Sequence, residues 1–138
     1  MWKKFEVSTR EETVDGIIVQ EISVRGSLDS STFQELQELL QSLLDEGKCN
    51  IVVEFSELDY ISSAGLGVLM GMLQEVRECN GDLKLANMAP KVRNLFDMLG
   101  FSRLIRIYDD LESARAAFSQ DQKNGVTEGS GPAAEDRY

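Results

Sequence analysis

The chain has 138 residues, 42% of them hydrophobic, which matches the size and composition of one globular domain with a buried core. Its formal net charge of −10 arises from 24 acidic and 14 basic side chains, and this balance disfavours binding to nucleic acid or to anionic membrane surfaces. The sequence contains no histidine, which excludes Ser-His-Asp and Cys-His catalysis and removes the commonest zinc ligand.

Targeting segments and disulfides are not predicted either. No apolar run reaches the roughly 18 residues of a membrane span, and the amino end lacks the apolar stretch of a signal peptide, so we expect a cytoplasmic protein. The two cysteines, Cys49 and Cys79, are too few for a disulfide framework, and both are expected to be buried thiols.

The chain opens with a predicted β-hairpin. Residues 4–10 and 16–25 are rich in β-branched and aromatic residues, and the turn signal Val14-Asp15-Gly16 separates them. Gly26 to Asp29 then break the strand pattern. Serines and a threonine at 30–32 are cap candidates for the helix that follows.

Helices and strands alternate through the rest of the chain. Apolar residues at helical spacing predict helices, and short apolar runs predict strands between them. The predicted elements are a helix from 33 to 44, a strand at 51–55, a helix from 66 to about 79, a strand at 83–86, a helix from 90 to 99, a strand at 104–108 and a helix from 111 to 118.

This ββαβαβαβα order predicts a sheet covered by helices, with parallel or mixed pairing. From about residue 120 the composition changes to polar residues, glycine and proline without an apolar period. We therefore expect a single domain over residues 1–119 and a disordered tail over 120–138.

The most informative segment is 55–71, where two adjacent serines follow a strand and glycines occupy the start of a helix. Ser62 or Ser63 is an N-cap candidate, and a phosphate on either would also be tolerated at a helix N-terminus. Gly65, Gly67 and Gly71 weaken the helix, so they indicate tight packing on the sheet or close approach by another molecule. Their spacing matches neither the dinucleotide fingerprint nor the phosphate loop.

Two acidic residues are candidates to lie near these serines. Asp29 and Asp59 would approach them if their strands ended at the same edge of the sheet. Alternatively, Asp29 starts an Asx turn or caps the first helix. Tyr60 is either an exposed contact or a half-buried strand end.

Taken together, these motifs resemble the STAS domain, and most closely the bacterial anti-sigma factor antagonists. The resemblance covers about residues 4–119. It rests on the segments Gly26–Asp29, Asp59–Leu69, Leu85–Met88, Val92–Phe96 and Leu99–Phe101.

The resemblance implies an α/β fold with a four- to five-stranded mixed sheet and about four helices packed largely on one side. It implies a partner-switching protein, a monomer when alone, that binds an anti-sigma factor which is also a serine kinase. That kinase would supply ATP and Mg²⁺ and phosphorylate the antagonist, and a serine phosphatase would reset it. The chain itself would have no catalytic residues, no metal and no cofactor. The partner-binding residues it implies are Asp29, Asp59, Tyr60, Ser62, Ser63, Ala64, Gly65, Leu66 and Gly67.

The chain departs from the family pattern at the phosphoacceptor. Many members read Asp-Ser-Ser-Gly or Asp-Ser-Thr-Gly, whereas this chain reads Ser62-Ser63-Ala64-Gly65. Ala64 cannot accept phosphate. Ser63 is therefore the first choice of acceptor and Ser62 the second, and a chain that is never phosphorylated remains an alternative.

Two other functions compete with this one. STAS-like domains also serve as constitutive scaffolds or as accessory modules of transporters. A small α/β hydrolase with Ser63 as nucleophile would have to recruit a lysine or carboxylate as its base.

Overall fold

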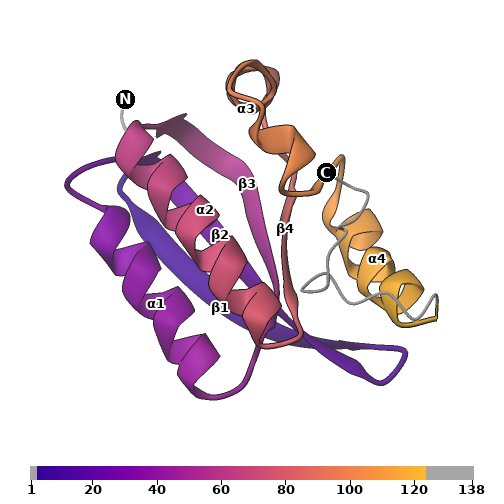
Figure 1. The fold of residues 1–138 in the computed structure, drawn as a ribbon. Helices are drawn as coiled ribbons and strands as arrows, with labels where there is room; N and C mark the ends of the chain where they lie inside the picture. Colours follow the sequence, from indigo (N-terminus) through magenta and orange to yellow (C-terminus); the bar gives the residue numbers. More distant parts are fainter. Residues whose placement is uncertain (1–2, 124–138) are drawn as a thin grey trace.

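The computed structural model describes residues 3–123, which form one five-stranded mixed sheet with helices on both of its faces (Figure 1). The strands follow one another in space in the order β1-β2-β3-β4-β5. The first two strands form an antiparallel hairpin, and every later strand adds in parallel. The strands are β1 (Glu6–Val14), β2 (Ile17–Leu28), β3 (Asn50–Ile61), β4 (Asp82–Ala86) and β5 (Ile107–Tyr108).

The helices of the described chain lie largely on one side of this sheet. They are α1 (Phe33–Asp45), α2 (Ser63–Glu78), α3 (Pro90–Met98) and α4 (Leu111–Lys123). Because neighbouring parallel strands are also consecutive in sequence, each right-handed crossover places its helix on the same face. α4 follows the last strand and belongs to no crossover, so this rule does not fix its face. It packs on the opposite face, where Phe118 joins Val19 and Val52. The structure thus confirms the predicted α/β architecture.

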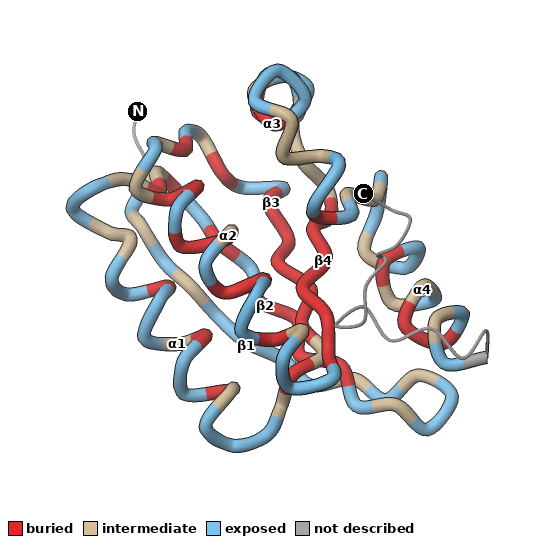
Figure 2. The backbone as a smooth tube through the Cα atoms, in the orientation of Figure 1, coloured by how far each residue is buried: buried red, intermediate tan, exposed pale blue. Residues whose placement is uncertain are grey.

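Side-chain alternation along the strands separates two apolar clusters. Ile51, Val53 and Phe55 of β3 belong to the larger cluster, which α1, α2 and α3 cover. Val52 faces the other way and joins the smaller cluster with Phe118 of α4. Figure 2 shows the consequence, since the central strands are buried along most of their length while the helices alternate between buried and exposed residues.

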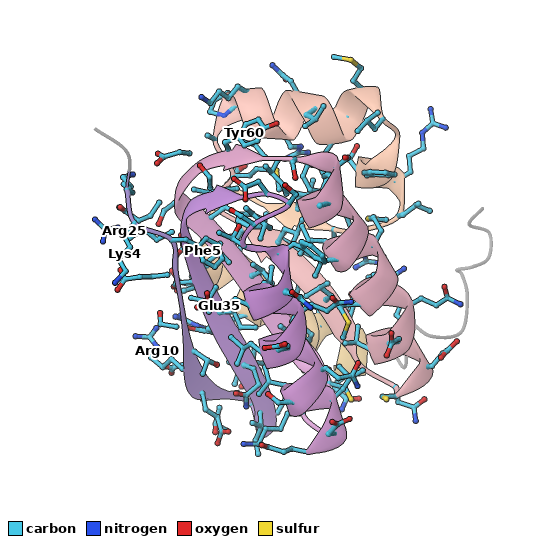
Figure 3. The ribbon with its side chains drawn as sticks, turned by 90° about the vertical axis from the view of Figure 1, so that its left-hand side faces the viewer. Lys4, Phe5, Arg10, Arg25, Glu35 and Tyr60 are labelled. Carbon is cyan, nitrogen blue, oxygen red and sulfur yellow. The ribbon has the colours of Figure 1, made fainter. Side chains whose placement is uncertain are left out.

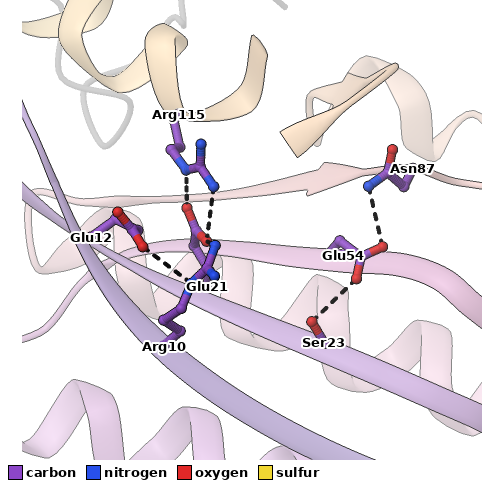
Figure 4. Close-up of polar contacts among 7 residues, drawn as sticks. All are labelled: Arg10, Glu12, Glu21, Ser23, Glu54, Asn87 and Arg115. Carbon is purple, nitrogen blue, oxygen red and sulfur yellow. Dashed lines mark hydrogen bonds and ion pairs between the residues drawn. The ribbon is translucent and has the colours of Figure 1, made fainter. Parts of the chain in front are cut away.

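Charged side chains help to hold α4 on its face of the sheet. Glu21 of β2 accepts hydrogen bonds from Arg10 and from Arg115 of α4 (Figure 4). Burial by itself raises the pKa of Glu21, but the bonds from these arginines outweigh it and leave the pKa below its ordinary value. Lys84 of β4 is 0% exposed, and its Nζ donates to Asp121 Oδ2 of α4 at 2.9 Å.

The predicted domain boundary at 119 falls inside α4, and this is a correction. Residues 120–123 continue the helix, and Asp121 is tied to the buried Lys84. The polar composition of this stretch did not indicate the ion pair between Asp121 and Lys84, which are 37 residues apart in the chain. Residues 124–138 of the predicted tail lie outside the described residues.

Several strand boundaries also differ from the expectation, and β1 continues to Val14 where the predicted strand ended at residue 10. β3 reaches Ile61 because β2 continues beside it to Leu28 through two register shifts. Gly26 does not end the strand, but lies inside β2 with a φ of +92°. A Cβ at this glycine would lie 3.0 Å from Phe5 Cα, so the backbone just before β1 approaches Gly26 closely. Of the predicted strand at 104–108, only β5 pairs with its neighbour.

Candidate functional site

The two serines lie at the edge of the sheet where parallel strands end. Leu28 of β2 and Ile61 of β3 are ladder partners, and the Ser62 N–H donates to the Leu28 carbonyl at 2.9 Å. The residues that follow these partners, Asp29 and Ser62, therefore leave the sheet at the same edge. In open α/β sheets this edge is the usual place for a binding site.

Ser62 starts α2 as its N-cap. Its backbone is extended, with φ −100° and ψ 176°, and its Oγ accepts a hydrogen bond from the Gly65 N–H. The distance of 3.5 Å makes this a weak cap. Ser62 is half-buried, and its hydroxyl is turned toward the helix. The capping role expected for one of the serines is confirmed for Ser62.

Ser63 differs from Ser62 because it is exposed at the first position of α2. Among residues 3–123, no hydrogen bond engages its hydroxyl. Ala64 beside it is half-buried. The geometry thus leaves one of the two serine hydroxyls free for another molecule.

The glycines of α2 divide into two kinds. A Cβ on Gly65 would lie 2.8 Å from Leu28 Cγ and 2.9 Å from Ile61 Cγ1, so Gly65 lets the helix start sit tightly on the strand ends. A Cβ on Gly67 or Gly71 would meet nothing within 4 Å. Close packing within the chain therefore explains why residue 65 is glycine. It does not explain the glycines at positions 67 and 71.

The two acidic candidates are engaged elsewhere. Asp29 Oδ1 accepts hydrogen bonds from the Ser31 N–H at 2.9 Å and the Ser31 hydroxyl at 2.8 Å, which is the alternative Asx turn. Asp59 pairs with Lys3 Nζ at 3.5 Å. Both lie near the correct edge of the sheet, but their recorded contacts are with these residues and not with Ser62 or Ser63.

The remaining candidates separate into surface and core. Tyr60 is 54% exposed, so the half-buried interpretation of this residue is wrong. Gly67 is exposed on α2. Leu66 is buried in the larger apolar cluster, and Gly65 is buried against Leu28 and Ile61. Both face the interior of the isolated chain, and their part in partner binding stays a prediction.

Sequence reasoning missed the exposed apolar residues at and after the end of α3. Met98 is 79% exposed, and Leu99 and Leu104 are also exposed. Helical spacing assigned Leu99 to the buried stripe, yet it is the residue at which α3 ends, so its side chain leaves the core. The sequence signal that separates it from Leu95 is Gly100, which follows Leu99 directly and adopts the left-handed conformation typical of a helix end.

A hollow lies beside the hairpin of β1 and β2, and neither Ser62 nor Ser63 lines it. It has a volume of about 510 Å³, is open to solvent and is lined in part by Lys4, Phe5, Arg25 and Glu35. Figure 3 shows these residues together, with Tyr60 apart from them.

Within the described range, acidic side chains and cysteines nowhere gather into a group of three that could hold a metal. Nor does any helix of residues 3–123 have the length and apolarity to cross a membrane.

Comparison with known proteins gives consistent results. The STAS domain family model matches residues 10–114. BtrV of Bordetella bronchiseptica, which bears the name of an anti-sigma factor antagonist, is 32% identical over 107 residues, covering 78% of this chain and 90% of that protein.

Solved structures of low identity share the fold. The crystal structure of an anti-sigma factor antagonist from Mycobacterium paratuberculosis has a TM-score of 0.70 at 22% identity, covering 83% of this chain and 95% of that one. The phosphorylated form of the Bacillus cell fate determinant SpoIIAA has a TM-score of 0.60 at 21% identity, covering 80% and 99%.

Proposed function

The chain belongs to the STAS domain family, and on this basis we propose that it is an anti-sigma factor antagonist switched by phosphorylation of Ser63. Its unphosphorylated form binds an anti-sigma factor that is also a serine kinase, and this binding releases a sigma factor. The single observation that carries the switch is the free, exposed hydroxyl of Ser63 at the first position of α2.

The exposed face of α2 supports a docking role. Gly67 and Gly71 each cost a helix about 1 kcal/mol relative to alanine, and nothing in the described chain fills the space beside them. With Ser63 they follow one another at intervals of four residues, so they share one side of the helix. A partner backbone can approach this side closely.

Phosphorylation of Ser63 would change this surface without breaking the helix. A phosphate carries about −1.5 to −2 charges, and the free N–H groups and positive dipole end of a helix N-terminus tolerate an anion. A surface of small residues would then become bulky, hydrated and anionic. We infer that the partner leaves for this reason.

The chain is the substrate in this cycle and not the enzyme. The kinase brings ATP and Mg²⁺, and a serine phosphatase removes the phosphate from Ser63. We place the cycle in the cytoplasm, where sigma factors act, with the antagonist monomeric between complexes. Ser62 is the less suitable acceptor because its hydroxyl is half-buried and caps α2.

The test is intact mass after incubation with the cognate anti-sigma kinase, ATP and Mg²⁺. We expect one phosphate on the chain, none on Ser63→Ala and one on Ser63→Thr, with Ser62→Ala still modified as the matched control. A phosphate that persists in Ser63→Ala and disappears in Ser62→Ala would overturn the choice of Ser63. Tight kinase binding with no phosphate on either serine would identify a constitutive antagonist instead.

A further inference from the structure

The two cysteines of the chain differ in exposure, against the expectation that both are buried. Cys49 is buried in the turn before β3, whereas Cys79 is exposed at the C-terminal cap of α2. They are the only cysteines in the sequence. An exposed thiol is open to reaction with small molecules in solution, and a buried thiol is protected unless a neighbour presents the reagent to it.

The turn after α2 brings the two cysteines together. The Asp82 N–H donates to the Cys49 carbonyl at 3.0 Å. Gly81 lies so close that a Cβ on it would be 2.6 Å from Cys49 Cβ and 2.0 Å from the Cys49 carbonyl oxygen. Only glycine fits here, and the consequence is that the segment carrying Cys79 passes directly over Cys49.

Cys79 is near enough to act on the Cys49 thiol. Burial raises the pKa of the Cys49 thiol to about 11, and the neighbouring Cys79 side chain contributes to the same shift. Cys79 ends a helix at the surface, so its side chain has room to turn toward Cys49. The fold therefore pairs one accessible thiol with one protected thiol.

We propose that Cys49 and Cys79 are a redox pair that forms a reversible intramolecular disulfide. The segment that this bond would close, residues 49–79, contains β3, both serines and all of α2. The bond would tie the far end of α2 to the start of β3 and leave Ser63 exposed. The proposal is independent of the function proposed for Ser63.

The chemistry is exchange with a low-molecular-weight disulfide. The Cys79 thiolate attacks one sulfur of that disulfide, releases one small thiol and forms a mixed disulfide. The Cys49 thiolate then attacks the Cys79 sulfur and releases the second small thiol. The small disulfide is reduced, the two cysteines are oxidised, and their two protons leave on the two small thiols.

The experiment treats the full chain with oxidised glutathione and follows it by intact mass and thiol titration. We expect the monomer to lose two hydrogens and both free thiols, dithiothreitol to restore them, and peptide mapping to join Cys49 to Cys79. The melting temperature should rise by about 5–10 °C on oxidation. Cys49→Ser is the control, and it should stop at the mixed disulfide on Cys79.

A native-against-denatured comparison tests whether the fold causes the pairing. At the same ratio of reduced to oxidised glutathione, the equilibrium constant for ring closure should be about tenfold larger in the native chain than in urea, because the folded turn holds the thiols together. A native chain that keeps glutathione on Cys79, or that forms a dimer linked through Cys79, would overturn the proposal. Equal equilibrium constants in both states would overturn it as well.

Discussion

The inner face of α2, which packs on the sheet, and its outer face, which is exposed, differ in what explains their residues. The inner face packs Leu66, Leu69, Leu73 and Val76 against the sheet, and Gly65 is glycine because an alanine would collide with the strand ends. The outer face carries glycines that nothing in the described chain requires, as at Gly67. Core packing accounts for the first face, whereas the second retains residues that weaken its own helix. This contrast is the reason for proposing an external contact on the outer face.

The largest expected effect is on the inner face. Leu69 is 0% exposed, and Leu69→Ala should lower the free energy of unfolding by about 3 kcal/mol because it leaves a cavity in the core. Urea denaturation measures the loss. Gln74→Ala, on the exposed face of α2, is the matched control and should change stability by no more than about 0.5 kcal/mol. Similar losses in both variants would mean that the two faces do not differ.

Gly65→Ala should come next, with a loss of about 1–3 kcal/mol. The added methyl group would lie 2.8 Å from Leu28 Cγ, so the helix start or the strand ends must shift. Thermal unfolding measures this. An unchanged melting temperature would show that the contact between helix start and strand ends is loose.

On the outer face the sign should reverse. Gly67→Ala and Gly71→Ala should each stabilise the chain by about 0.5–1 kcal/mol, since alanine is the better helix former and the space is open. Each should also weaken binding of the anti-sigma partner by about tenfold, measured by calorimetry. Stabilised variants that bind as tightly as the parent chain would contradict docking on this face.

A smaller effect is expected at the cap between the two faces. Ser62→Ala removes an acceptor whose bond to the Gly65 N–H is 3.5 Å long, so the loss of stability should be about 0.5 kcal/mol. Chemical denaturation measures this loss of stability. Ser63→Ala is the control, because it removes an exposed hydroxyl that does not cap α2. A loss above about 1.5 kcal/mol would show a stronger cap than the distance indicates.

The smallest effect concerns the start of α1 at the same edge of the sheet. Hydrogen bonds from the Ser31 side chain and backbone, together with Thr32, hold the pKa of Asp29 below its ordinary value of 3.8. Because the folded pKa is depressed, the contribution of Asp29 is complete above 3.8 and is lost as the pH falls through the folded pKa. An NMR titration of the Asp29 carboxyl carbon checks the direction. A midpoint above 3.8 would contradict the Asx turn.

Local patterns predicted much of the fold and part of the site. Apolar spacing is a property of short segments, so the helices, the hairpin and the sheet class followed from it. The failures were long-range. The Lys84–Asp121 pair, which extends α4, and the ladder that lengthens β3 join segments distant in the sequence. The exposure of Cys79 was likewise decided by packing.

By itself, the sequence determined that two serines precede a helix weakened by glycines, in an acidic chain without histidine. That was sufficient to select the candidate site and to exclude histidine-dependent catalysis. The sequence ranked Ser63 above Ser62 only through the family resemblance, and only the tertiary structure showed which hydroxyl caps α2 and which glycine is closely packed. The physical reason is that neighbouring residues of one type have the same intrinsic properties. They differ because Ser62 and Gly65 lie against the strand ends, whereas Ser63 and Gly67 face away from them.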